Sequence, residues 1–208
     1  MDALPRLYLI TNRKAVPGCD LIACLAAALA AGVRLVQLRE KDLSARDLLT
    51  LAEQAQAVCA AHGARLLIND RADVALAVGA AGVHLTSADP PVAEVRDLLG
   101  SEALIGVSTH HPAEVVAAGA EGADFVTFGP VYDTPSKRGM GDPAGTAGLS
   151  RAVTEAEVPV FALGGVNAGR IREVMATGCH GAALISGVMA STDPGAASAA
   201  LLEQTNPL

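Results

Sequence analysis

The feature that most constrains the fold is a regular alternation of short apolar runs with longer helical stretches along the whole chain. The apolar runs cover residues 6–10, 34–38, 65–68, 82–85, 104–107, 125–128, 158–163 and 181–185. Each run and the stretch after it make a strand–helix unit of roughly 25 residues, and eight such units predict an α/β fold, a (β/α)8 TIM barrel. We expect one domain over residues 1–208. A doubly wound open sheet is the alternative, but no Gly-x-Gly-x-x-Gly turn follows the first run.

Composition limits the partners that the protein can have. The chain of 208 residues is 51% hydrophobic but only 2% aromatic, so we expect a core of Ala, Val, Leu and Ile. A net charge of −7 argues against a nucleic-acid surface. No apolar run reaches the roughly 18 residues of a membrane span, and the N-terminus does not read as a signal peptide. We therefore expect a cytoplasmic protein with neither nucleic-acid nor membrane partners, and we interpret its scattered cysteines, Cys19, Cys24, Cys59 and Cys179, as thiols.

Helix boundaries follow from capping residues. Asp20 and Ser44 are predicted N-caps of two Ala/Leu-rich helices, and Pro112 is predicted to open another. After the run at 125–128, helical periodicity resumes only at about Leu149. The intervening segment is therefore predicted to be a long loop.

This loop, residues 129–141, carries groups that suit an anion. Thr134 and Ser136 offer hydroxyls, Lys137 and Arg138 offer positive charge, and Gly139 lets the backbone approach a ligand. Long loops inside a compact domain are commonly lids or binding loops. The alternative is a solvated loop whose charges are incidental.

In a barrel, chemistry is expected where strands end and the following loops begin. Gln37, Arg39 and Lys41 alternate at the end of the second run, so an extended backbone would point them to one side. They predict a basic surface that binds an anion. The alternative is a salt bridge between Arg39 and Glu40 or Asp42.

Carboxylates follow the third and fourth runs. Asn69 and Asp70 close the third run, and Asp89 lies after the fourth. Mg²⁺ takes one or two protein carboxylates, with water and substrate phosphates as further ligands. A Mg²⁺–diphosphate site is therefore predicted, whereas the alternative makes Asp89 an N-cap close to Pro91.

Ser108 ends the fifth run and can donate to a phosphate oxygen. Single histidines are weaker indications of a catalytic site. His110, in the loop after Ser108, is a candidate for proton transfer. His84 lies within a strand and can equally be a satisfied core histidine. His180 precedes the eighth run, at the other end of the barrel, and is predicted to be structural.

A second anion site is predicted at the last two strands. Gly164 and Gly165 follow the seventh run, and Ser186 and Gly187 follow the eighth. Glycine backbone N–H groups can converge on a phosphate there, and barrels of this class commonly bind phosphate at that position.

With these residues in view, the chain resembles the family of thiamine phosphate synthase and the related thiazole tautomerase along nearly its whole length. The matching segments are Val36-Gln-Leu-Arg-Glu-Lys41, Ile68-Asn-Asp70, Gly82-Val-His-Leu85, Gly106-Val-Ser-Thr-His110, Gly129-Pro-Val-Tyr132, Thr134-x-Ser-Lys137 and Ala162-Leu-Gly-Gly165. The resemblance implies a barrel transferase that joins hydroxymethylpyrimidine diphosphate to a thiazole phosphate and releases diphosphate.

The resemblance also implies roles for individual residues. It assigns the pyrimidine diphosphate to Gln37, Arg39, Lys41, Asn69, Ser108 and Lys137, and the thiazole phosphate to Thr134, Ser136, Gly165, Ile185 and Ser186. It assigns the cofactor Mg²⁺ to Asp70 and Asp89. Catalysis would rest on Lys137, Ser108 and Arg39, with His110 as a helper. The partners are thus small phosphorylated substrates; a homodimer is possible, but the sequence leaves the oligomeric state open.

The chain departs from the synthase pattern after Leu85. It reads Thr86-Ser-Ala-Asp89 where a synthase usually has Gly-Gln and an acidic pair, although Asp89 can still be aligned with the metal ligand. One alternative is therefore a thiazole tautomerase that uses His110. The other is a non-catalytic sensor of phosphorylated ligands, which would need the anion sites but no pair of metal-binding carboxylates.

Overall fold

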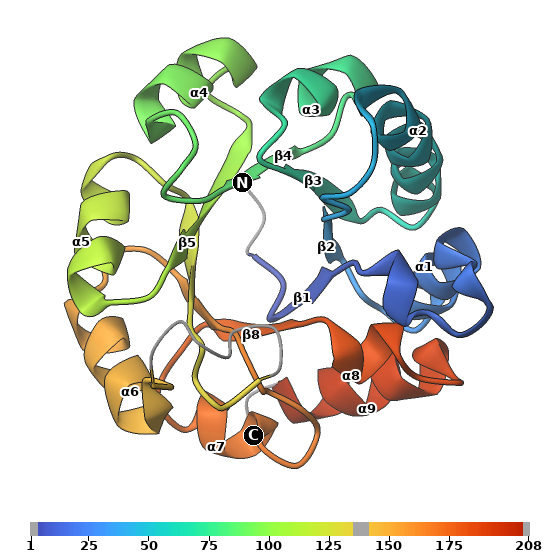
Figure 1. The fold of residues 1–208 in the computed structure, drawn as a ribbon. Coiled ribbons are helices and arrows are strands. Elements are labelled where there is room, and N and C mark those ends of the chain that lie inside the picture. Colours follow the sequence, from blue (N-terminus) through green and yellow to red (C-terminus); the bar gives the residue numbers. More distant parts are fainter. Residues whose placement is uncertain (1–3, 135–141, 206–208) are drawn as a thin grey trace.

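The structure is a computed structural model that describes residues 4–134 and 142–205, without the side chain of Cys19. Eight parallel strands pair in chain order and close into a barrel, with β8 beside β1 (Figure 1). The strands are β1 (Leu7–Ile10), β2 (Leu35–Leu38), β3 (Arg65–Asn69), β4 (Gly82–Leu85), β5 (Leu104–Thr109), β6 (Phe125–Phe128), β7 (Val160–Ala162) and β8 (Gly181–Leu184). The predicted TIM barrel is confirmed.

The helices lie outside the ring of strands (Figure 1). They are α1 (Leu21–Ala30), α2 (Ala45–Ala61), α3 (Ala72–Val78), α4 (Val92–Leu99), α5 (Pro112–Ala120), α6 (Gly145–Glu155), α7 (Ile171–Met175), α8 (Ser186–Met189) and α9 (Pro194–Thr205). Two 3-10 turns, η1 (Arg13–Ala15) and η2 (Pro17–Cys19), precede α1. The last helix, α9, packs against the first helix, α1, and also contacts β1.

Capping residues set the helix starts as expected. The Asp20 carboxylate accepts a hydrogen bond from the Ala23 N–H at 2.9 Å, and the Ser44 hydroxyl accepts one from the Asp47 N–H at 3.2 Å. Each satisfies a backbone N–H that has no partner inside its helix.

Two predicted boundaries are wrong. Strand β5 continues to Thr109 because Ser108 and Thr109 pair with β6. Helix α6 begins at Gly145, earlier than the apolar periodicity indicates. Its first turn is held against the loop after β6, since the Gly145 N–H donates to the Val131 carbonyl at 3.0 Å.

The apolar core has an outer layer and an inner layer. Between strands and helices it is mostly aliphatic, as the composition predicts, although Phe128 also belongs to it. Inside the barrel it contains Tyr8, Phe125 and Phe161, three of the five aromatic residues of the chain. Phe125 meets both Tyr8 and Phe161 edge-on, with ring centroids 5.4 Å apart in each pair. Aliphatic residues therefore make up most of both layers, and the inner layer adds a cluster of aromatic rings that the composition does not predict.

Two further features bear on the sequence predictions. Cys24, Cys59 and Cys179 are buried free thiols, in agreement with the absence of disulfides expected for them. Within residues 4–134 and 142–205, no helix combines the length and the apolar character needed to cross a membrane.

Candidate active site

Three of the polar residues predicted to bind the diphosphate lie on strands β2, β3 and β5. Gln37 is in β2, Asn69 ends β3 and Ser108 lies in β5. The register pairs Asn69 with His84 of β4, and Leu38 with Ile68. These side chains therefore sit near the carboxyl ends of β2 to β5, which is one edge of the barrel.

The segment after β2 is anchored by Glu40. Its buried carboxylate accepts hydrogen bonds from the Thr11 hydroxyl at 2.7 Å, and from the Arg13 N–H and guanidinium at 2.9 and 3.1 Å. The Thr11 hydroxyl oxygen in turn accepts a hydrogen bond from the Arg39 N–H at 2.9 Å. A buried carboxylate with several donors fixes this loop to β1.

That anchoring leaves two cations available. Asp42 pairs with Arg13 at 2.6 Å and with Lys14 at 2.7 Å, and these partners hold the pKa of its carboxyl well below the usual range. Among the described residues, no ion pair involves Arg39 or Lys41. The alternative of a salt bridge from Arg39 to Glu40 or Asp42 is therefore wrong.

Asp70 has an unusual backbone conformation. Its φ of 54° is the only positive φ at a non-glycine residue in the part of the chain that the structure describes. The Asn69 side-chain amide donates to the Asp70 carboxylate at 2.7 Å, and the Asp70 N–H donates to the His84 carbonyl at 3.0 Å. Such strained positions persist where the surroundings fix them, and they concentrate at functional sites.

Asp89 does not cap α4. Its Oδ2 atom accepts hydrogen bonds from the Thr86 N–H at 2.6 Å and from the Thr86 hydroxyl at 2.8 Å. The N-cap of α4 is Pro91, without a side-chain hydrogen bond. The N-cap interpretation of Asp89 is therefore wrong, and none of the hydrogen bonds between described residues uses its Oδ1 atom.

The two carboxylates act on each other. Burial raises the pKa of the Asp70 carboxyl and the negative charge of Asp89 raises it further, while Lys41, Arg71 and Arg39 oppose the rise. A cation bound between the two would relieve this repulsion. Among residues 4–134 and 142–205, no three His, Cys, Asp or Glu side chains gather as metal ligands. Two carboxylates still fit Mg²⁺, which takes its other ligands from phosphates and water.

His84 occupies the middle of the barrel. Its Nδ1 atom lies 3.2 Å from the Tyr8 hydroxyl and its Nε2 atom lies 3.0 Å from the Ser108 hydroxyl. Gly106 makes room for it, because a Cβ there would come within 2.5 Å of His84 Nδ1 and 2.4 Å of the Phe125 ring. His84 is thus a fully hydrogen-bonded core histidine that also contacts a predicted site residue.

Burial makes His84 a source of acid sensitivity. Burial, with a smaller contribution from Arg39, lowers its pKa from 6.5 to about 3. As the pH falls from 6.5 toward 3, the unfolded chain binds a proton that the folded protein excludes, so the free energy of unfolding decreases. Between pH 7 and pH 5 this histidine should cost about 2 kcal/mol. Urea unfolding should show that His84→Gln loses less stability over this interval than wild type; equal losses would contradict the prediction.

His110 lies in the loop after β5. Its backbone N–H donates to the Glu114 carboxylate at 2.6 Å. Its Nδ1 atom is buried and has no hydrogen-bond partner within the described residues. A buried polar atom without a partner is costly, so this nitrogen is available to a ligand.

At the opposite side of the barrel, the loops after β6 and β7 are tightly joined. Gly164 and Gly165 both have positive φ, and a Cβ on either would come within 2.7 Å of Pro130 or Tyr132. Tyr132 is held further by Glu173, which accepts its hydroxyl at 2.9 Å, and by the Arg170 guanidinium 4.4 Å above its ring. These glycines are therefore required by protein packing, whatever they do for a phosphate.

The rest of the predicted phosphate site is described in part. Ile185 follows β8 as the N-cap of α8, and Ser186 is exposed at the first position of that helix. Thr134 is half-buried after the Tyr132 turn. Ser136 and Lys137 lie outside the described residues.

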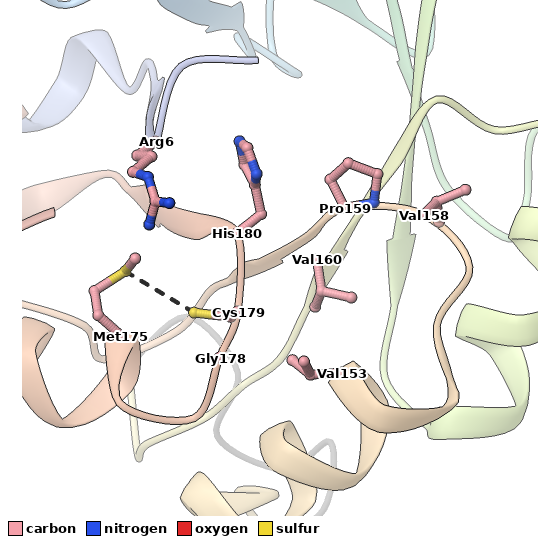
Figure 2. Close-up of a pocket in the computed structure, with 9 residues that line it drawn as sticks. All are labelled: Arg6, Val153, Val158, Pro159, Val160, Met175, Gly178, Cys179 and His180. Carbon is pink, nitrogen blue, oxygen red and sulfur yellow. Dashed lines mark hydrogen bonds between the residues drawn. The ribbon is translucent and has the colours of Figure 1, made fainter. Parts of the chain in front are cut away.

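A surface cavity lies at the other end of the barrel. It has a volume of about 410 Å³ and is lined by Arg6, His180 and residues that precede β7 and β8 (Figure 2). His180 bonds the Leu4 carbonyl at 2.9 Å and packs edge-on against Phe161, which confirms its structural role. The cavity is far along the strands from the polar ends of β2 to β5 and holds none of the predicted site residues.

Comparison with known proteins decides the family. The profile of the family described as thiamine monophosphate synthase matches residues 7–188. The chain belongs to the thiamine monophosphate synthase family. A relative from Geobacter sulfurreducens is 53% identical over 201 residues, which cover 97% of this chain and 94% of that protein. A thiamine-phosphate synthase from Gloeobacter violaceus is 44% identical over 98% of this chain, which spans 58% of that longer protein.

A solved structure agrees with the family. Thiamine phosphate pyrophosphorylase from Pyrococcus furiosus superposes with a TM-score of 0.88 at 32% identity, over 96% of this chain and 95% of that chain. The expected resemblance is therefore confirmed at the level of family and fold.

Within this thiamine monophosphate synthase barrel, three residues have supporting roles that the sequence pattern does not predict. In the sequence, Tyr8 is part of an apolar run, Glu40 is an alternative partner for Arg39, and Gly106 is one residue of a matching segment. Only the parallel register brings Tyr8 and Gly106 to His84. The one signal in the sequence was the rarity of Tyr, with two in the whole chain.

Proposed function

We propose that the protein is a Mg²⁺-dependent thiamine phosphate synthase, which couples hydroxymethylpyrimidine diphosphate with thiazole phosphate and releases diphosphate. The family match supports the activity. The observation that carries the substrate assignment is that Arg39 and Lys41, beside Asp70 at the edge formed by β2 to β5, make no ion pair with any other residue that the structure describes. Cations kept out of protein ion pairs suit a polyanionic ligand.

In this proposal the pyrimidine diphosphate lies over Gln37, Asn69 and Ser108, with its phosphates toward Arg39, Lys41 and Lys137. Asp70 and Asp89 hold Mg²⁺, which when bound offsets the charge of the departing diphosphate. Diphosphate leaves first, and the thiazole nitrogen then attacks the pyrimidine cation. Arg39, Lys41 and Lys137 stabilise the leaving group as its charge develops, so the enzyme needs no general base for the attack.

The thiazole phosphate is assigned to the opposite half of the edge, at Thr134, Ser136, Gly165, Ile185 and Ser186. Support comes from the anchored loops there: the Val131 N–H donates to the Leu163 carbonyl, and the Tyr132 N–H to the Gly164 carbonyl, at 2.9 and 3.0 Å. A loop held at its base can position a second substrate. The two substrates then meet across the barrel mouth.

A thiazole tautomerase is the second candidate, favoured by the unpartnered Nδ1 atom of His110. A neutral imidazole nitrogen near a substrate can move a proton. A sensor without catalysis is the third and would bind ligand without Mg²⁺ dependence. A cytoplasmic location and a homodimeric state remain predictions.

One experiment separates the three. Purified protein is incubated with both substrates and Mg²⁺, and separately with thiazole carboxylate phosphate alone, and the products are identified by mass spectrometry and chromatography. We expect thiamine phosphate in the first mixture and unchanged thiazole in the second. Isomerised thiazole without thiamine phosphate would identify a tautomerase, and binding with no product at all would identify a sensor.

A further inference from the structure

A continuous line of buried hydrogen bonds crosses the barrel interior from β2 to β5. Gln37 Nε2 donates to the Tyr8 hydroxyl at 2.9 Å, the Tyr8 hydroxyl contacts His84 Nδ1 at 3.2 Å, and His84 Nε2 contacts the Ser108 hydroxyl at 3.0 Å. Tyr8, Gln37 and His84 are each at most 2% exposed. Both ends of the line, Gln37 and Ser108, are assigned to the pyrimidine diphosphate.

The order of donors along this line follows from counting protons. The Tyr8 oxygen accepts from Gln37, so its single hydrogen goes to His84 Nδ1, its other contact among the described residues. A neutral imidazole with an accepting Nδ1 carries its proton on Nε2 and donates it to Ser108. The Thr127 hydroxyl, 3.4 Å from Nε2, is a longer second contact.

This order fixes what the two ends offer to a ligand. Ser108 accepts from His84, so its own hydrogen is free to be donated into the site, where phosphate oxygens only accept. Gln37 donates one side-chain N–H to Tyr8. None of the hydrogen bonds among the described residues uses the Gln37 Oε1 atom. This oxygen can therefore accept a hydrogen bond from an N–H of the substrate.

We infer that Tyr8 and His84 are positioning residues that form a buried relay between Gln37 and Ser108 and set which hydrogen-bonding groups those two side chains present to the pyrimidine diphosphate. The assignment rests on the proposed function for the identity of the ligand. Gly106 belongs to the same arrangement because it leaves the space that the imidazole fills.

The test is a double-mutant cycle with Tyr8→Phe and Ser108→Ala. Among the described residues no interaction joins Tyr8 directly to Ser108, so any coupling between them would pass through His84, the partner that they share. We expect Tyr8→Phe to lower kcat/KM for the pyrimidine diphosphate about tenfold by itself, and by a smaller factor of about threefold in the Ser108→Ala background, where only its effect through Gln37 remains. The KM of thiazole phosphate should not change, whereas a purely structural role would not separate the two substrates.

A matched control uses Phe161→Leu, which changes the ring packing against Tyr8 but removes none of the hydrogen bonds of the relay. Its effect should be the same with and without Ser108→Ala. If Tyr8→Phe does not fold, the cycle is run with His84→Asn, whose shorter side chain cannot reach Ser108. The inference would be overturned if the relay variant lowered kcat/KM for the pyrimidine diphosphate by the same factor with and without Ser108→Ala.

A failure of the proposed function can be distinguished from a failure of the relay. Wild-type protein that forms no thiamine phosphate contradicts that function, and the same four proteins are then titrated with inorganic diphosphate and Mg²⁺ by calorimetry. The relay predicts that Tyr8→Phe weakens diphosphate binding less in the Ser108→Ala background than in wild type, because Ser108 still donates to a phosphate oxygen in this experiment. Additive changes in affinity would overturn it in this arm as well.

Discussion

The Asp70→Asn variant should lose thiamine phosphate formation by about 10²-fold or more in kcat, because the proposed Mg²⁺ site would lose one of its two anionic ligands. The Mg²⁺ concentration for half-maximal rate should rise. Its stability should not fall, since burial and the neighbouring Asp89 already oppose the negative charge of Asp70 in the folded protein. Steady-state kinetics against Mg²⁺ and urea unfolding measure both effects.

Asp73→Asn is the matched control. Asp73 lies on the outside of α3, where its exposed carboxylate pairs with Arg71 at 2.6 Å. This variant should keep the wild-type rate and the wild-type Mg²⁺ dependence. An unchanged Mg²⁺ dependence in Asp70→Asn would remove the two-carboxylate site from the account.

The Lys137→Ala variant should lower kcat by about 10²–10³-fold, because under the proposed function it would lose a cation that stabilises the departing diphosphate. His110→Ala should lower thiamine phosphate formation by less than about tenfold, because the coupling reaction needs no proton transfer from it. Lys14→Ala, which removes a lysine paired with Asp42, serves as the control and should behave as wild type. A large loss in His110→Ala with a small one in Lys137→Ala would instead favour the tautomerase.

The barrel could be predicted from the sequence because each strand is a short apolar run followed by polar residues. The same rule located Gln37, Asn69 and Ser108 at the ends of neighbouring strands, where the structure has them. Local capping signals were reliable for the same reason, since Asp20 and Ser44 act within their own helix turns.

What the sequence could not show depends on contacts between distant segments. A salt bridge from Glu40 to its neighbour Arg39 is the alternative that the sequence offers, but the fold brings Arg13 and Thr11 to the Glu40 carboxylate instead. The position of Asp89 before Pro91 makes it a plausible N-cap of α4, yet its carboxylate accepts a hydrogen bond from the Thr86 N–H instead. The burial of Tyr8 against His84 depends on register across the barrel, and no local pattern encodes it.

Glycines show the same limit. Gly165 was interpreted as room for a phosphate, whereas a side chain there would first meet Tyr132 and the Asp133 carbonyl. Gly165→Val is for that reason a poor probe of the phosphate site. Ser186, exposed at the start of α8, is a cleaner one.

The most direct test of the account is the stoichiometry of the reaction under Mg²⁺ control. Wild-type protein with both substrates should release one diphosphate for each thiamine phosphate formed, and a chelator should stop both together. Each product is quantified in the same reaction mixture. Diphosphate release without thiamine phosphate, or formation of thiamine phosphate that persists in excess chelator, would contradict a metal-dependent coupling at the ends of β2 to β5.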